Sequence, residues 1–188
     1  MKMHRTHPRR AICALRRFNA SQSGSMSVEA VLVAPLLLFG IMFVLTFFSA
    51  FQQKGTANKA AYTVADYISR QTDAVDADFI DGMADIYGFL NNQGNKKMRV
   101  SSVMWSESRG GKYVLQWSHA ADDADALTSS TLSEIESLLP IMSAGTTVLV
   151  VEATTRWTPI FSVGLDVLNF KDIVITKPRF ATQVIFDD

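Results

Sequence analysis

One long apolar run dominates the pattern of hydrophobic and polar positions. From Ala30 to Phe51 the chain carries no charged residue. An α-helix rises about 1.5 Å per residue, so about 20 such residues cross a hydrocarbon core about 30 Å thick. In a soluble protein, a helix of this length without a polar stripe would have no face for water. The run therefore predicts one transmembrane helix, which we place at residues 28–52.

The helical pattern continues beyond the apolar run. Ala61, Val64, Ala65 and Ile68 follow at spacings of three and four residues, so we expect the helix to extend to about Arg70. The acidic stretch from Asp73 to Asp78 then breaks it. A second helix is predicted from about Asp78 to Leu90, before the turn-prone sequence Asn91-Asn92-Gln93-Gly94. Its predicted apolar face consists of Phe79, Met83, Ile86, Tyr87 and Leu90.

After this second helix the hydrophobic pattern shortens to a period of two, which is typical of β-strands. Strands are predicted at Met98–Trp105, at Tyr113–Trp117, at Thr146–Trp157 and at Ile173–Phe186, the last with Phe180, Thr182, Val184 and Phe186 alternating. Arg109-Gly110-Gly111-Lys112 predicts a hairpin turn between the first two strands. A short helix is expected from Thr131 to Leu139, ended by Pro140, with Leu132, Ile135, Leu138 and Leu139 facing the core.

These elements predict an α+β fold. We expect a long N-terminal transmembrane helix followed by a small antiparallel sheet with helices packed on one side, so that residues 53–188 form one domain. Trp105, Trp117 and Trp157 lie in alternating strands, which favours a place in the core over an exposed adhesive surface.

The distribution of charge predicts the topology. The chain has 18 basic and 18 acidic side chains, and this balance argues against a nucleic-acid-binding protein. Positive charge is concentrated before the apolar run, where Lys2, Arg5, Arg9, Arg10, Arg16 and Arg17 occur with no acidic residue until Glu29. By the positive-inside rule, residues 1–27 form a basic cytoplasmic leader and the domain lies on the far side. A cleavable secretory signal is the alternative, with Gly55-Thr56-Ala57 as its best cleavage pattern.

The sequence offers little catalytic or metal-binding chemistry. His119 with Asp122, Asp123 and Asp125 matches no zinc or EF-hand spacing, and a solvated turn is the favoured interpretation. The acidic run Asp73, Asp76, Asp78, Asp81 and Asp85 suits a helix N-terminus better than a calcium site. The chain has one cysteine, Cys13, and no phosphate-binding loop or hydrolase motif. We expect no enzymatic activity, no cofactor and no metal.

Glu29 stands at the start of the apolar run, five positions after Gly24. One interpretation is a carboxylate at the headgroup level, whose charge suits the N-terminal end of the helix dipole. The spacing from Gly24 to Glu29, with basic residues before it and an apolar helix after it, resembles the processing site of type IV prepilins. The resemblance implies that a prepilin peptidase cuts between Gly24 and Ser25. It also implies that Glu29 pairs with the N-terminal amine of a neighbouring subunit during assembly.

A longer resemblance covers residues from Arg16 to Ala65. The residues that carry it are Arg17, Gly24-Ser25, Val28-Glu29, Ala34-Pro35-Leu36-Leu37-Leu38 and Ala57-Asn58-Lys59-Ala60-Ala61. This region resembles TadE/TadG-like proteins, the pilin-like components of bacterial tight-adherence (Flp) pilus systems. Major Flp pilins have an aromatic residue after the glutamate and little chain beyond the helix, whereas here Ala30 follows and a whole domain comes later.

These differences favour a minor subunit or assembly factor over the main filament subunit. The resemblance implies a single-pass protein of the bacterial inner membrane, with its domain in the periplasm or incorporated in a pilus. Its expected partners are membrane lipid, other pilin-like subunits, the pilus assembly machinery and a prepilin peptidase. The first alternative is a membrane-anchored periplasmic binding or sensing module, and the second is a tethered enzyme.

Overall fold

The apolar run forms part of one long helix, α2 (Ser23–Ser69), in a computed structural model that describes residues 23–92, 97–122 and 124–187. Within these residues it is the one helix that is long and apolar enough to cross a membrane. The chain divides into two units, Met1–Leu45 and Thr46–Asp188. In the first unit α2 is the only described element, and from Met26 to Leu45 its side chains are exposed except for the half-buried Met42. Burial begins in the second unit, at Thr46.

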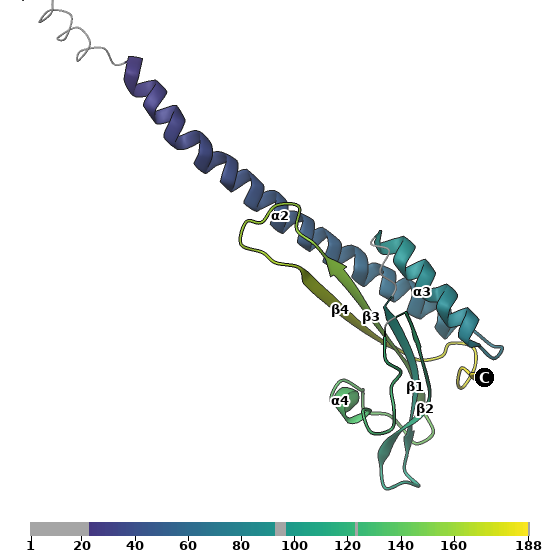
Figure 1. Cartoon of the computed structure of the whole chain (residues 1–188). Helices are drawn as coiled ribbons and strands as arrows, with labels where there is room; N and C mark the ends of the chain where they lie inside the picture. Colours follow the sequence, from purple (N-terminus) through teal and green to yellow (C-terminus); the bar gives the residue numbers. More distant parts are fainter. Residues whose placement is uncertain (1–22, 93–96, 123, 188) are drawn as a thin grey trace, which may run out of the picture. The chain divides into compact units, whose positions relative to one another are not determined.

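The second unit is built on a four-stranded antiparallel sheet. Its strands are β1 (Met98–Ser106), β2 (Lys112–Ala121), β3 (Thr147–Trp157) and β4 (Leu168–Thr176), in the order β2-β1-β3-β4 (Figure 1). β1 and β2 form the predicted hairpin. Gly110 and Gly111 have φ angles of 84° and 70°, a left-handed conformation that glycine adopts without strain, so the turn prediction is confirmed.

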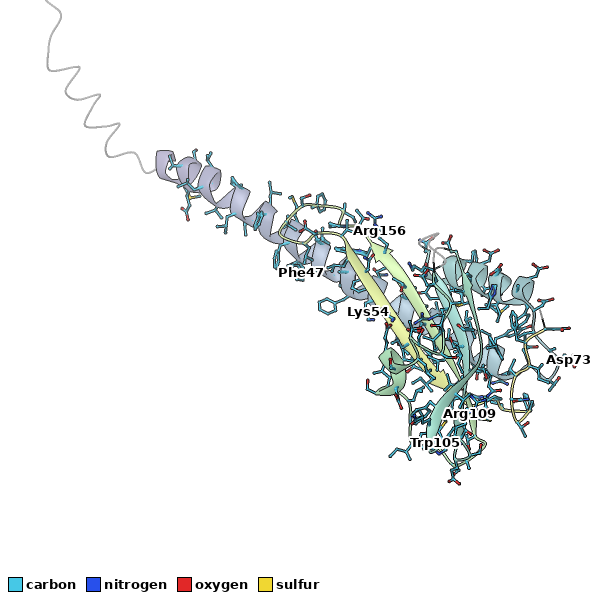
Figure 2. All side chains as sticks on the ribbon, turned by 60° about the horizontal axis from the view of Figure 1, so that its bottom comes forward. Phe47, Lys54, Asp73, Trp105, Arg109 and Arg156 are labelled. Carbon is cyan, nitrogen blue, oxygen red and sulfur yellow. The ribbon has the colours of Figure 1, made fainter. Side chains whose placement is uncertain are left out.

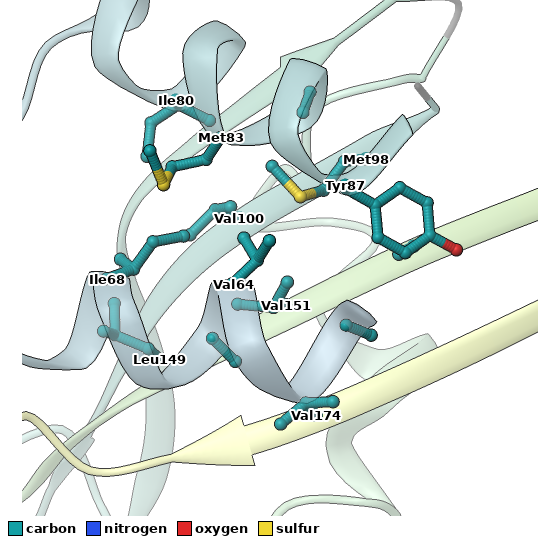
Figure 3. Close-up of a cluster of buried hydrophobic side chains, with 14 of the residues drawn as sticks. Val64, Ile68, Ile80, Met83, Tyr87, Met98, Val100, Leu149, Val151 and Val174 are labelled. Atoms are coloured by element: carbon teal, nitrogen blue, oxygen red, sulfur yellow. The ribbon is translucent and has the colours of Figure 1, made fainter. Parts of the chain in front are cut away.

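One face of the sheet packs against the C-terminal part of α2 and against α3 (Ala77–Asn91). Figure 3 shows Val64 and Ile68 of α2, and Ile80, Met83 and Tyr87 of α3, around the strand side chains. The strands contribute every second residue to this cluster: Met98, Val100, Leu149, Val151, Ala153 and Val174. The predicted continuation of α2 to about Arg70 is confirmed, because Ala61, Val64, Ala65 and Ile68 are all buried here.

The opposite face of the sheet is covered by the segment between β2 and β3, which contains the short helix α4 (Ser133–Glu136). Its buried side chains are Leu127, Leu132, Ile135, Leu139 and Met142, which pack on Val103, Val148 and Val150. The prediction that all helices pack on one side of the sheet is therefore wrong for α4. The helix is also a single turn, and Leu138, predicted to face the core, is exposed.

Two further predictions need correction. β4 begins at Leu168 and ends at Thr176, so the predicted strand from Ile173 to Phe186 is wrong over most of its length. Pro178 cannot donate to a strand ladder, and beyond it only an isolated bridge joins Val75 to Phe186. Phe180 is exposed, whereas Val184 is buried.

The apolar face of α3 is displaced from the predicted one. Ile86 and Leu90 are exposed and Phe79 is half-buried, while the buried positions are Ile80, Met83, Ala84, Tyr87, Gly88 and Asn91. The acidic run before this helix has a structural role at its start. Asp76 is the N-cap, its Oδ1 accepting a hydrogen bond of 2.7 Å from the Phe79 N–H, and Asp78 lies in the first turn.

All three tryptophans contribute to the interior of the unit. Trp157 is buried, while Trp105 and Trp117 are half-buried against the two clusters. Trp117 Nε1 donates a hydrogen bond of 2.8 Å to the Val184 carbonyl, which ties the C-terminal segment to the edge strand β2. The expectation that they fill the core is confirmed for Trp157 and holds in part for the other two.

Candidate functional site

The three residues predicted as a processing and assembly site lie together at the start of α2. Gly24 and Ser25 are in its first turn, and Glu29 follows within the same continuous helix. The Glu29 side chain is exposed. The basic leader, including Arg16 and Arg17, lies outside the described residues, as does Cys13.

Glu29 is electrostatically isolated within its helix. No charged residue follows it until Lys54, and within the residues that the structure describes no ion pair involves Glu29. An unpaired carboxylate in lipid is unfavourable by about 2.5–3.5 kcal/mol at the bilayer centre, and less at an edge. A cationic partner from another molecule would therefore be stabilised at this position.

The second unit anchors the far end of the helix through small residues. Ala57, Ala60, Ala61 and Ala65 of α2 are buried, and their short side chains allow the helix backbone to approach the sheet closely. These alanines belong to the stretch in which the sequence resembles TadE-like proteins. The buried alanines show that the end of the TadE-like stretch packs against the domain.

Gly24, Ser25, Glu29, the apolar run and the alanine-rich end follow one another on one helix. Residues 24–66 match the family model of TadE-like proteins. The chain thus carries a TadE-like N-terminal segment. No curated protein and no solved structure was found to match the chain.

The TadE-like segment is joined to β4 by a partly buried ion pair. Lys54 Nζ lies 2.8 Å from Asp172 Oδ1, and Asn58 Nδ2 donates a hydrogen bond of 3.1 Å to the same oxygen. The Asp172 side chain is 3% exposed, whereas that of Lys54 is 42% exposed. A buried carboxylate requires such partners, because burial without them disfavours its charged form. Sequence reasoning missed this pair because its members are 118 residues apart.

A second group of polar contacts joins the TadE-like segment to α3 and the sheet. Gln53 Nε2 donates a hydrogen bond of 2.9 Å to the Asn91 carbonyl. Asn91 Nδ2 donates to Thr155 Oγ1 at 3.2 Å, and the Tyr87 hydroxyl lies 2.5 Å from the same oxygen. Burial raises the pKa of the Tyr87 phenol above its usual value of 10.0, although its hydrogen bonds to Thr155 and Asn91 oppose the shift.

A group of charged side chains on the sheet forms ion pairs between neighbouring strands. Glu152 is buried between Arg99 of β1 and Lys171 of β4, whose Nζ is 2.8 Å from Glu152 Oε1. These side chains line a surface hollow of about 190 Å³. The Glu152 carboxylate of β3 is thus paired with cations from both neighbouring strands.

The histidine considered as a metal ligand is engaged elsewhere. His119 Nε2 lies 2.9 Å from Asp81 Oδ1 of α3, and its ring stacks on Phe186. Of its neighbours in the sequence, Asp123 lies outside the described residues. Within the described part of the chain, no three His, Cys, Asp or Glu side chains gather in a way that could hold a metal ion.

Proposed function

We propose that the chain is a pilin-like minor subunit or assembly factor of a bacterial Flp (tight-adherence) type IV pilus system. The observation that carries the proposal is the TadE-like match over residues 24–66, which includes Gly24, Ser25 and Glu29 on one helix. The role is structural rather than catalytic, and it requires no cofactor. A domain of more than a hundred residues beyond the helix supports a minor or accessory component over the main filament subunit.

The proposed location is the bacterial inner membrane. Residues 28–52 span the bilayer once, the basic residues 1–27 remain in the cytoplasm and residues 53–188 lie in the periplasm. The exposed apolar surface of α2 from Val28 to Leu45 supports this topology, because its leucine, valine and phenylalanine side chains need a hydrocarbon environment. In one form of the proposal the C-terminal domain accompanies the helix into a pilus, and in the other it remains with the assembly machinery. The experiments below distinguish these outcomes.

Glu29 supplies the proposed assembly mechanism. Its carboxylate stands at the cytoplasmic edge of the span without a partner in its own helix. The free amine of a neighbouring subunit, created by cleavage of that subunit's leader, would neutralise it. Because the pair forms only when the two helices have the matching axial position, the charge pairing favours one register between neighbouring subunits.

The decisive test of assembly is Glu29→Gln in the bacterium that makes the protein, with Glu107→Gln as the matched control. Both changes remove one carboxylate, but Glu107 is exposed beside the β1–β2 turn. We expect Glu29→Gln to lower pilus number and the co-purification of pilus components at unchanged protein level, while Glu107→Gln matches the wild type. Normal pili with Glu29→Gln would overturn the proposal and favour a periplasmic binding or sensing module.

The first residue of the mature protein distinguishes a minor pilus subunit from an assembly factor. Mass spectrometry of the protein from membranes and from sheared pili would show Ser25 as its first residue if the prepilin peptidase processes it. A mature Ser25 in the pilus fraction identifies a minor subunit. An intact leader on protein that is found only in membranes identifies an assembly factor.

A further inference from the structure

Apolar side chains gather in the second unit where the β3–β4 connection meets α2. This connection comprises residues 158–167, and within it Ile160 is 73% exposed, with Phe161 and Val167 also exposed. Phe47, Ala50 and Phe51 of α2 line a hollow of about 180 Å³ together with Leu165, Leu168 and Phe170. We call these nine residues the loop–helix patch. Exposed apolar side chains in a connection that also lines an apolar hollow point to an interaction site rather than ordinary solvent-facing surface.

The helix side of the patch belongs to the end of the predicted span. Counted from Ala30, about 20 residues at 1.5 Å each bring the helix across the hydrocarbon core near Ser49. Phe47, Ala50 and Phe51 therefore lie at the membrane boundary on the domain's side. Leu165 of the β3–β4 connection lines the same hollow, as do Leu168 and Phe170 of β4, so the end of the connection lies at this level too.

The composition around the patch suits a membrane interface. Lys54 also lines the hollow, with its Nζ 5.8 Å from the centre of the Phe170 ring, and Arg156 is exposed at the end of β3. Figure 2 shows Phe47, Lys54 and Arg156 in this part of the unit. Aromatic side chains with lysine or arginine close by are typical of the boundary between lipid and water. The Lys54 ammonium is held by Asp172, so Arg156 is the basic side chain of the two that would reach the headgroups. Asp166 is the one acidic residue in the connection.

We propose that the β3–β4 connection is a second membrane contact, through which Ile160, Phe161 and Val167 enter the interfacial region of the bilayer that α2 crosses. The occupant of the patch is lipid, because the patch is continuous with helix residues that already need lipid. This contact would restrain the domain at two points, the helix and the connection. The inference rests on the membrane anchoring in the proposed function.

The test measures the surroundings of a nitroxide label in the full chain. Single cysteines are introduced at Ile160, at Ile141 and at Leu32 in a Cys13→Ser background, and the labelled proteins are placed in bilayer nanodiscs that each hold one copy. Frequent collisions of the nitroxide with oxygen, which concentrates in the bilayer, show that the label lies in lipid. Frequent collisions with a water-soluble nickel chelate show that it lies in water. Ile141 is the matched control, since it is an isoleucine that is 101% exposed in the connection between α4 and β3, outside the patch. Leu32 reports the span itself.

We expect the labels at Ile160 and Leu32 to favour oxygen several-fold more than the label at Ile141. If Leu32 reports lipid while Ile160 behaves like Ile141, the second contact is wrong and the membrane anchor stands. If Leu32 reports water, the anchor fails, and the proposed function fails with it. Protection of Ile160 in liposomes with many copies but not in single-copy nanodiscs would show that another copy of the chain occupies the patch, which overturns the lipid contact.

Discussion

At the scale of single residues, buried and exposed polar groups differ in how their charge is compensated. Asp172 is buried but receives Lys54 and Asn58, so its charge is satisfied within the fold. Glu29 has no such partner within the described chain, although it stands at the start of a helix suited to lipid. An isolated carboxylate beside an apolar span is unfavourable for a chain on its own. Its position supports the proposed contact with a second molecule.

Tyr87→Phe tests the buried polar contacts between α3 and the sheet. The change removes the hydroxyl that lies 2.5 Å from Thr155 Oγ1, while Asn91 still donates to that oxygen. We expect the free energy of unfolding at neutral pH to fall by about 0.5–1.5 kcal/mol, the usual net contribution of one hydrogen bond. Urea unfolding followed by tryptophan fluorescence measures it. Tyr62→Phe, at an exposed position of α2, should change little.

The stability of the wild type and that of Tyr87→Phe should also depend differently on pH. Burial raises the pKa of Tyr87 in the folded state, so the folded protein keeps the phenolic proton at pH values where the unfolded chain, with a pKa of about 10, loses it. The stabilising contribution is complete below about pH 10 and is lost as the pH rises through the folded value. Wild-type stability should thus fall more steeply above about pH 10 than that of Tyr87→Phe. Parallel curves for the two proteins would contradict this assignment.

At the scale of elements, secondary structure is predicted best where one hydrophobic periodicity continues over many residues. The continuation of α2 is an example, because Ala61, Val64, Ala65 and Ile68 repeat at helical spacing and all face the core. β4 was misplaced for a physical reason. Its first half contains Lys171 and Asp172, which look like loop residues until the distant Lys54 is brought beside Asp172. The alternation after Pro178 resembles that of a strand, but within the described residues this segment forms no strand ladder, only an isolated bridge between Phe186 and Val75.

For the candidate site too, the sequence predicts residues that are close along the chain and misses those that only the fold brings together. Gly24, Ser25 and Glu29 could be selected from the sequence because their spacing is short and lies within one helix. Lys54 with Asp172, and Tyr87 with Thr155, could not, because each pair depends on tertiary contacts between residues more than sixty positions apart. The loop–helix patch was missed for the same reason. The residues 158–167 alone have no periodicity to suggest that they meet the end of the span.

Ile68→Ala tests whether α2 is an integral part of the domain core. Ile68 is fully buried between α3 and the sheet (Figure 3). Truncation to alanine should lower the free energy of unfolding by about 2–5 kcal/mol through lost burial and the cavity left behind. Tyr62→Ala is the control on the same helix, since surface substitutions usually change stability by less than about 0.5 kcal/mol. An equal effect of the two changes, measured by urea unfolding in detergent, would contradict the proposed packing.

At the scale of the whole molecule, the boundary between anchor and domain falls inside one continuous helix. The second unit begins at Thr46, whereas the apolar run continues to Phe51, so six residues are shared by the apolar run and the folded unit. In the first unit no side chain between Met26 and Leu45 is buried. Membrane anchoring and domain folding are thus carried by different segments of α2, although the chain has no linker between them.

This arrangement predicts different results from two N-terminal deletions. Removal of residues 1–45 takes away no buried side chain among those described, so the remaining chain should fold with nearly wild-type stability. Removal of residues 1–69 also deletes Ala61, Val64, Ala65 and Ile68 from the core cluster and exposes the strand side chains that they cover. Because each large buried aliphatic side chain contributes about 1.5–3 kcal/mol, their joint loss approaches the 5–15 kcal/mol stability of an ordinary domain.

Circular dichroism and hydrogen exchange, in one detergent-containing buffer, compare the two deletion variants with the full chain. The shorter deletion should retain cooperative unfolding and slow exchange in β1 and β3, the central strands of the sheet. The longer one should exchange rapidly throughout and show no cooperative transition. If the chain that begins at residue 70 nevertheless folds cooperatively, α2 is only a tether. Loss of folding in the shorter deletion would instead mean that residues before Thr46 stabilise the domain.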